Sequence, residues 1–420
     1  MVDKRKTEKK HRFASPALSS SGSKAKSSML ERLQLPVILV LLVLYISTLI
    51  RKPTEISGKA DTSNVKRDQS LGSGSVSRPA KSFIYTGPQT TWTPWTHDFP
   101  CFPAEPSWKS IAVQRSPSRT GLLFVREMKT GSSTVAGIML HIAHRRGFVT
   151  GNASHAETSP CRVRIDHSSA SRLAYKNRDV TKSFLLSLLR DPTKRAISHF
   201  FHFQVSEKKQ DPTDKNFQDF FRRRAASWSN YYVKDLVMNL DDLQKGFNDD
   251  DIVKEILSKY NFIAITERMD ESLVVLKQLL GLQMEDILYM SAKTHGSFTT
   301  GPGTSPCIYI VPSFLTSGMK EFFESQYWKN YTRADQRLYD AAVQSLDNTI
   351  DALGRKKVEE ELLIFRRARQ YAQQLCEERT EYRCNSKGEY IGNNSTCYLW
   401  DIGCGNQCLN EISISKDVLK

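Results

Sequence analysis

Three apolar runs along the chain have the length and composition of buried strands. They occupy residues 121–125 (GLLFV), 183–189 (SFLLSLL) and 260–266 (YNFIAIT). Apolar residues at helical spacing follow the first and third runs, namely Val135, Ile138, Met139 and Ile142, and then Leu273, Leu276, Leu279 and Leu280. Strands that alternate with amphipathic helices predict an α/β fold, with a parallel sheet and flanking helices.

Weaker patterns fill the intervals between these elements. Residues 163–167 (VRIDH) predict a strand at the edge of the sheet, and residues 193–205, 217–224 and 318–375 predict helices. Residues 83–110 carry Trp92, Trp95 and Trp108 together with several prolines, a composition that predicts an irregular ordered segment packed on the domain.

The N-terminal region has a different pattern. Residues 33–50 (LQLPVILVLLVLYISTLI) contain no charge, and about 18 to 20 apolar residues span a bilayer. Because no small-residue cleavage site follows, we expect a transmembrane signal anchor rather than a cleaved signal peptide. Residues 51–82 are rich in Ser, Gly, Lys and Thr and predict a flexible stem. The globular domain is therefore expected over residues 83–375.

Charge predicts the orientation of this anchor. The tail, residues 1–32, holds nine lysines and arginines against three acidic residues, which places it in the cytosol by the positive-inside rule. The net charge of +15 leaves about +9 for the remainder, which suggests anionic ligands. Nucleic acid is excluded as a partner because the remainder is expected in a lumenal or extracellular compartment.

The cysteines fit that compartment. All eight follow the apolar span, so disulfides are expected. The last five lie at Cys376, Cys384, Cys397, Cys404 and Cys408. They lack zinc-pair spacing and no histidine lies among them, so residues 376–420 predict a small disulfide-bonded appendage. Sequons begin at Asn152, Asn330, Asn393 and Asn394.

A hydroxyl-rich turn joins the first strand to its helix, in the sequence Lys129-Thr130-Gly131-Ser132-Ser133-Thr134. Unpaired N–H groups in the first turn of a helix, together with the helix dipole, favour an anion at this place. The order differs from the NTPase loop, in which the lysine follows the glycines. The turn by itself is consistent with a phosphate-binding loop or with an ordinary Ser/Thr-capped helix.

The second strand ends in the same manner. Arg190 lies at its carboxyl end, where ligands bind in open α/β sheets, and Pro192 suits the first turn of the helix that carries Ser198. An arginine offers phosphate a two-pronged donor, and a serine hydroxyl adds one more. The alternative is an Arg190–Asp191 ion pair at a helix start. Two anion sites together suit a nucleotide with phosphate at two positions.

These segments resemble a known group of enzymes. KTGSST and LLRDPTKRAISHFF look like the nucleotide-binding loops of Golgi carbohydrate sulfotransferases, which use 3′-phosphoadenosine 5′-phosphosulfate (PAPS). Residues 265–290 and 337–354 are similar to the galactose-3-O-sulfotransferase family, which includes galactosylceramide sulfotransferase. The Arg-Asp-Pro form of the second loop and the histidine between the loops resemble heparan and uronyl 2-O-sulfotransferases. The resemblance covers residues 118–360 and implies a P-loop-NTPase-like sulfotransferase fold.

The resemblance also implies roles for single residues. The residues that would hold the 5′-phosphosulfate are Lys129, Thr130, Gly131, Ser132, Ser133 and Thr134. Arg190 and Ser198 match the pair that holds the 3′-phosphate, and His167 stands where the 2-O-sulfotransferases keep a catalytic base. A histidine suits proton removal near neutral pH, and Lys129 suits the charge that develops on the bridging oxygen. Among the other histidines, His199 is the strongest rival as the base.

The leading hypothesis is a metal-independent, PAPS-dependent sulfotransferase that modifies galactose, at its 3-hydroxyl, on a glycolipid or glycoprotein glycan. It would lie in the Golgi membrane as a single-pass type II protein with a lumenal catalytic domain. One alternative is a uronyl 2-O-sulfotransferase acting on a glycosaminoglycan, for which more basic clusters are expected. Another is an inactive membrane-anchored glycan-binding protein, against which Lys129, Arg190 and Ser198 argue. A kinase lacks support because no acidic Mg²⁺-binding motif is evident in the sequence.

Overall fold

A parallel four-stranded sheet forms the centre of the computed structural model, as the apolar runs predict. The strands are β1 (Gly121–Val125), β2 (Val163–Asp166), β3 (Ser183–Leu189) and β4 (Phe262–Ile265). Their order is β2-β1-β3-β4, and every neighbouring pair is parallel. β1, β3 and β4 are buried along their whole length, whereas the edge strand β2 is half-buried. The α/β prediction and the edge position of residues 163–166 are confirmed.

The structure describes residues 85–100, 120–147, 163–244, 248–290, 297–298, 307–392 and 403–414. The predicted tail, anchor and stem, residues 1–82, lie outside these ranges. None of the helices within them is long and apolar enough to span a membrane.

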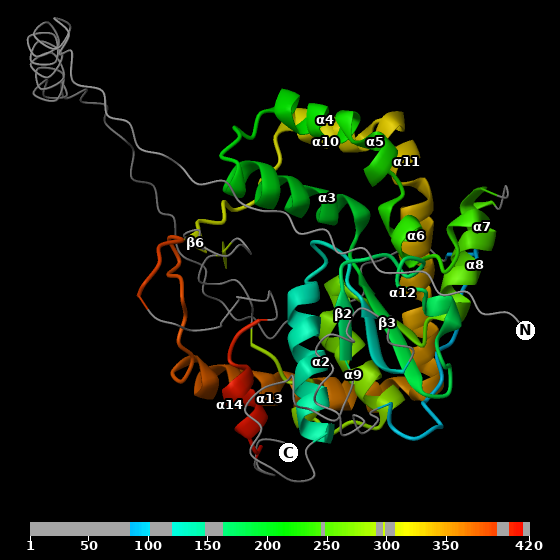
Figure 1. The fold of residues 1–420 in the computed structure, drawn as a ribbon, viewed down its shortest axis with the longest axis vertical. Coiled ribbons are helices and arrows are strands. Elements are labelled where there is room, and N and C mark those ends of the chain that lie inside the picture. The colour runs from blue at the N-terminus through cyan, green and yellow to red at the C-terminus, as the bar shows by residue number, and fades with distance from the viewer. Residues whose placement is uncertain are drawn as a thin grey trace, which may run out of the picture. The chain divides into compact units, whose positions relative to one another are not determined.

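Helices flank the sheet and continue beyond its carboxyl edge. They are α2 (Ser132–Gly147), α3 (Pro192–Phe200), α4 (Asp214–Arg223), α5 (Ala225–Trp228), α6 (Tyr231–Leu236), α7 (Leu240–Gln244), α8 (Asp249–Lys259), α9 (Met269–Leu280), α10 (Ser317–Glu324), α11 (Gln326–Tyr331), α12 (Arg333–Leu353), α13 (Arg355–Glu377) and α14 (Asn406–Glu411). Figure 1 shows α2 on one side of the strands and α12 on the other, with α3, α4 and α10 above the end of the sheet where α2 begins.

Local sequence explains where several helices begin and end. Asp191 caps α3 by accepting the Lys194 N–H at 2.8 Å, and Pro192 occupies the first turn. Asn248 caps α8, whose first turn holds three aspartates that favour the positive end of the helix dipole. One boundary differs from the sequence-based expectation: the helix from residue 193 is α-helical only to Phe200 and continues as a π-helix, η4 (Phe201–Glu207).

The segment before the first strand packs on the domain without regular structure, as its tryptophans predict. Trp92 is buried against Phe262 of β4, with ring centroids 5.2 Å apart. Its backbone N–H donates to the Thr349 hydroxyl of α12 at 3.0 Å. Residues 85–100 therefore cover the sheet beside α12, and the core extends ahead of β1.

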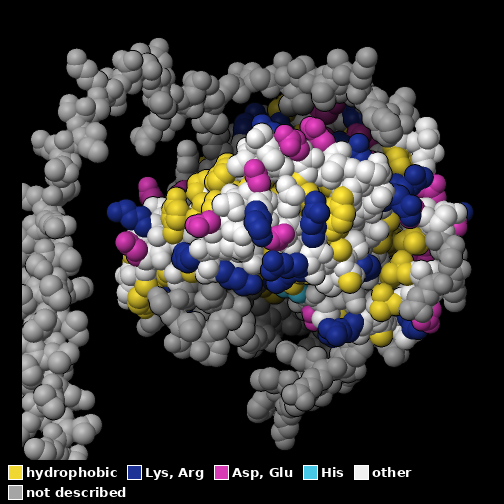
Figure 2. Space-filling view, turned by 90° about the horizontal axis from the view of Figure 1, so that it is seen from above, with side chains coloured by type: hydrophobic (Ala, Val, Ile, Leu, Met, Phe, Trp, Pro, Cys, Tyr) yellow, Lys and Arg dark blue, Asp and Glu magenta, His cyan; other side chains and the backbone are white. Residues whose placement is uncertain are grey.

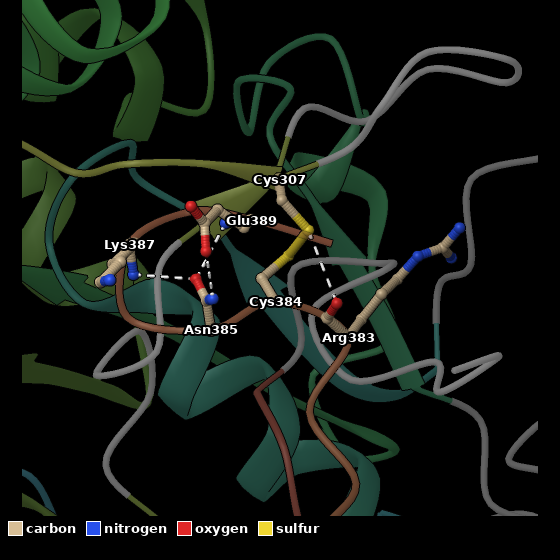
Figure 3. The surroundings of a disulfide bond; sticks show 6 residues. All are labelled: Cys307, Arg383, Cys384, Asn385, Lys387 and Glu389. Carbon is tan, nitrogen blue, oxygen red and sulfur yellow. Dashed lines mark hydrogen bonds between the residues drawn. A yellow bond between two sulfur atoms is a disulfide. The ribbon is translucent and has the colours of Figure 1, made fainter. Parts of the chain in front are cut away.

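Disulfides hold the C-terminal segment. Cys376 at the end of α13 is bonded to Cys408 in α14, and Cys307 is bonded to Cys384. Figure 3 shows the second bond beside a turn in which the Asn385 side chain accepts the backbone N–H groups of Lys387 and Glu389. A Cβ at Gly388, with φ of 75°, would lie 2.0 Å from the backbone nitrogen of Tyr309. The turn therefore requires glycine at this position. The boundary at residue 376 stays a prediction.

Candidate functional site

Polar residues gather at the carboxyl edge of the sheet because its strands are all parallel. Arg126 follows β1, His167 follows β2, Arg190 follows β3 and Thr266 follows β4. The chain passes from β1 to β2 on one side and then to β3 on the other, so the strand order reverses beside β1. Ligands of open α/β sheets bind outside the strand ends at such a reversal.

The loop after β1 is closed by its own hydroxyl groups. Thr130 and Ser132 both donate to the Glu127 carbonyl, at 3.0 and 2.7 Å, and α2 begins at Ser132. Two residues have left-handed backbone, Lys129 with φ of 64° and Gly131 with φ of 81°. A residue other than glycine in this conformation costs about 1 kcal/mol or more, and such residues occur often at functional sites. The backbone conformation at Lys129 is therefore one that a lysine does not favour by itself.

Because the loop is closed in this way, fewer of its side-chain hydroxyl groups can donate hydrogen bonds to a phosphate. Thr130 and Ser132 are buried and their hydroxyl hydrogens are used within the loop, so their backbone N–H groups are the donors available in the usual helix-terminus manner. The Ser133 hydroxyl accepts from Arg126 Nη2 at 3.1 Å. Gly131 is exposed and Thr134 is half-buried. The loop fits an anion through main-chain groups and the helix dipole.

His167 lies beside this loop with a defined tautomer. Its Nδ1 is 2.8 Å from the backbone carbonyl of Arg126, and a carbonyl only accepts hydrogen bonds. Nδ1 therefore carries the hydrogen, and Nε2 is the basic nitrogen. This is the arrangement that a general base requires, because a fixed hydrogen bond on one nitrogen orients the other. The ring is exposed at the end of β2.

The rival histidines lie in different surroundings. His199 is 4% exposed, and burial together with Arg195 and Lys129 lowers its pKa to about 2. His141 is also buried, with its two ring nitrogens in contact with Asn410 and the Glu285 carbonyl, which ties α2 to α14. Both rings serve packing. His155 and His295 lie outside the described residues.

The end of β3 is held by residues from other elements. The Arg190 backbone N–H donates to the Tyr232 hydroxyl at 3.2 Å, and that hydroxyl donates to the Arg190 carbonyl at 2.7 Å. The Arg190 Nη1 donates to the Lys129 carbonyl at 3.3 Å, so the guanidinium reaches the first loop. Asp191 serves as the helix cap. The predicted alternative of an Arg190–Asp191 ion pair is therefore not the local arrangement.

Ser198 lies elsewhere on α3. It is half-buried, and six residues of helical rise place it about 9 Å along the helix from Pro192. Because the Arg190 guanidinium points toward the Lys129 carbonyl, the structure joins Arg190 to the first loop and does not join it to Ser198. The shared 3′-phosphate contact stays a prediction.

Two residues after β4 complete the edge, and the sequence-based reasoning missed both. The Thr266 hydroxyl lies 2.5 Å from the Thr130 carbonyl and 2.9 Å from the Leu189 carbonyl, so it connects both strand ends. Glu267 Oε1 lies 4.0 Å from Arg190 Nε and 3.8 Å from Lys194 Nζ. Their position directly after an apolar strand is the signal that could have identified them.

A buried ionisable group lies beneath the first loop. Glu127 is fully buried, and desolvation raises the pKa of its carboxyl well above the usual range. Arg195 of α3, 4% exposed, opposes this shift and stacks on Tyr231 with its guanidinium carbon 4.4 Å from the ring centroid. This group joins β1 to α3 and α6 under the loop. Across the described ranges, no group of His, Cys, Asp and Glu side chains is arranged to hold a metal ion.

Comparisons with known proteins agree with this geometry. A family model described as galactose-3-O-sulfotransferase matches residues 27–386. The chain is 21% identical over 315 residues to human galactose-3-O-sulfotransferase 3, covering 67% of this chain and 72% of that protein. It is 21% identical over 347 residues to bovine galactosylceramide sulfotransferase, covering 70% and 73%.

Proposed function

Because the chain belongs to the galactose-3-O-sulfotransferase family, and is thus a carbohydrate sulfotransferase, we propose that it transfers the sulfuryl group of PAPS to galactose. The acceptor would be the 3-hydroxyl of a galactose on a glycolipid or glycoprotein glycan. Two relatives carry names of this kind, galactose-3-O-sulfotransferase 3 and galactosylceramide sulfotransferase. At about 20% identity, the names of relatives do not identify the substrate of this chain. The proposal therefore rests on the residues at the carboxyl edge of the sheet.

The observation that supports it most is the contact between the two strand ends that would bind anions. The Arg190 guanidinium donates to the Lys129 carbonyl at 3.3 Å, so two cationic residues and the start of α2 share one edge. A nucleotide with a 5′-phosphosulfate and a 3′-phosphate carries negative charge at two separated points. One loop would hold the phosphosulfate through main-chain N–H groups and Lys129, and Arg190 would meet the 3′-phosphate.

We propose the following reaction at this edge. The acceptor oxygen attacks the sulfur as its proton moves to Nε2 of His167, and the sulfur–oxygen bond to the nucleotide breaks. The products are the sulfate ester and adenosine 3′,5′-bisphosphate. Lys129 stabilises the negative charge that develops on the bridging oxygen of the leaving group.

The surface above α3 bears on the glycosaminoglycan alternative. Figure 2 shows lysine and arginine side chains on this face interspersed with acidic and apolar ones. On α4, Asp219 pairs with Lys215 at 2.8 Å and with Arg223 at 3.4 Å. Neighbouring carboxylates reduce the field that a polyanionic chain would follow. This face therefore favours an uncharged acceptor over a polyanionic chain.

The proposal is tested with the purified full-length chain in detergent. Radiolabelled sulfate from PAPS is offered with galactosylceramide, galactose-terminated glycans and a desulfated glycosaminoglycan, and binding of adenosine 3′,5′-bisphosphate is measured by calorimetry. We expect label on the 3-hydroxyl of galactose. Label on a uronic acid would support the alternative enzyme. Neither transfer nor nucleotide binding would overturn the enzymatic proposal.

We also propose a lumenal Golgi location, with residues 33–50 as the anchor. Support comes from the uncharged apolar run and from two disulfides, Cys307–Cys384 and Cys376–Cys408, which suit an oxidising compartment. Protease protection of a C-terminal tag in sealed Golgi vesicles tests it. A tag digested without detergent would contradict this topology.

A further inference from the structure

A half-exposed phenylalanine lies next to the predicted catalytic lysine. Phe203 belongs to the π-helix η4, and the Lys129 ammonium is 5.6 Å above its ring centroid. The imidazoles of His199 and His202 contact the same ring, at centroid distances of 4.7 and 4.6 Å. An aromatic surface thus meets a cation of the donor loop.

Within η4, Phe203 lies outside the aromatic cluster that buries the neighbouring phenylalanines. Phe200 and Phe201 are fully buried in a cluster with side chains of α4, α10 and α11, and Phe203 is not among its buried members. The Ser206 hydroxyl donates to the Phe201 carbonyl at 2.7 Å and accepts the Val311 N–H at 3.0 Å. π-Helical turns are rare and occur often at functional sites. Here the turn keeps Phe201, Val205 and Ser206 buried and leaves Phe203 half-exposed between them.

The surroundings of Phe203 combine aromatic rings with the cations Lys129, Arg195 and Arg224. His199 packs on Trp228 and Phe220, with centroid distances of 4.3 and 5.4 Å, and burial lowers its pKa to about 2, so this ring is uncharged. Trp228 is itself half-buried. Apolar rings with a few polar groups at the edge are typical of small-ligand sites.

We propose that Phe203 is the platform on which the acceptor galactose stacks, with the sugar's 3-hydroxyl beside Lys129. The axial 4-hydroxyl of galactose leaves the hydrogens at C3, C4 and C5 on one face, and this apolar patch suits an aromatic ring. Glucose, whose 4-hydroxyl is equatorial, lacks so continuous a patch. The inference rests on the proposed function and adds the residue that would select the sugar.

The ring belongs to the acceptor side because of its cation. Under the proposed function Lys129 contacts the transferred sulfuryl group, and the adenine lies at the opposite end of the nucleotide. The ammonium lies over the Phe203 ring, so the transferred group would sit beside this ring.

The test replaces the ring in the full-length enzyme. Phe203→Leu keeps an apolar side chain without an aromatic face and should raise KM for a β-galactoside about tenfold, with unchanged binding of adenosine 3′,5′-bisphosphate. Phe203→Trp keeps the face and should hold KM within about twofold. Phe323→Leu is the matched control, since Phe323 is a half-buried ring that packs on Phe217 and Trp328.

The outcomes separate this inference from the function on which it rests. An unchanged KM in Phe203→Leu would overturn the platform, and so would a parallel loss of nucleotide binding, which would assign the ring to the donor. An equal rise in KM for Phe203→Trp would also overturn it. A wild-type enzyme that neither binds nucleotide nor transfers sulfate would instead overturn the proposed function.

Discussion

The two strand ends that form the candidate site are built in different ways. The loop after β1 is closed by residues within five positions of one another, through Thr130, Ser132 and the Glu127 carbonyl. The end of β3 depends on distant residues, since Tyr232 holds the Arg190 backbone and Glu267 lies 4.0 Å from its guanidinium. The first end combines these local bonds with contacts from Thr266 and Arg190, whereas the second end is held through distant residues.

This difference has a consequence for binding. The Thr130 and Ser132 hydroxyl groups hold the first loop in its bent shape, although Lys129 there has left-handed backbone. At the second end a carboxylate faces the arginine that would meet phosphate. The first loop would therefore bind its anion without rearranging. At the second end, the incoming phosphate would have to replace the Glu267 carboxylate beside Arg190. Four substitutions test this contrast.

Lys129→Ala should have the largest effect, with a fall in kcat of a thousand-fold or more, because it removes the charge beside the developing oxyanion. Alanine has the same backbone cost as lysine at φ of 64°, so the loop should keep its shape. Sulfate transfer and the melting temperature are measured together. Lys215→Ala, at an exposed residue of α4, is the control and should retain full activity. Full activity of Lys129→Ala would remove the lysine from the reaction.

His167→Gln should lower kcat about a hundred-fold, because glutamine cannot accept the acceptor's proton. Its amide can still donate to the Arg126 carbonyl, so the contact at 2.8 Å has a substitute and both KM values should change little. His199→Asn is the comparison, since a ring with pKa of about 2 is a poor base near neutral pH. A larger loss of kcat in His199→Asn than in His167→Gln would reverse the two assignments.

The same contrast explains what sequence predicts here. β1 and β3 have the predicted bounds, and the turn KTGSST joins β1 to α2 as predicted, while its role in binding stays a prediction. Glu267 carries a local signal, its position directly after an apolar strand, but its pairing with Arg190 depends on β4 lying beside β3. Tyr232 was missed because its role depends on α6 returning to the edge. The π-helix from Phe201 was also missed, since hydrophobic spacing does not distinguish it from a continued α-helix. Long-range pairing carries no local signal.

Asp335→Asn tests the remote support of the second end. Asp335 is buried and accepts the Val233 N–H of α6 at 3.1 Å, and α6 carries Tyr232. Burial raises the pKa of this carboxyl to about 6, so the folded state keeps a proton that the unfolded state releases above about pH 4. Stability contributed by this group therefore falls as pH rises from about 4 to 6.

Asparagine cannot ionise and still accepts the Val233 N–H. The free energy of unfolding of Asp335→Asn, relative to wild type, should therefore increase by about 2 kcal/mol between pH 4 and pH 7. Urea unfolding at the two pH values measures this difference. The same difference at both values would show that the buried carboxyl keeps an ordinary pKa.

Glu267→Gln should have the smallest effect and the opposite sign for binding. Removing the carboxylate that faces Arg190 and Lys194 should tighten binding of adenosine 3′,5′-bisphosphate several-fold, and this gain should shrink at high salt. The amide oxygen still accepts from the Tyr339 hydroxyl, 3.0 Å away in the wild type. Glu271→Gln, beside Arg268, is the matched control and should bind as wild type does. Weaker binding in Glu267→Gln would mean that the carboxylate positions Arg190, and the second strand end would then be preorganised like the first.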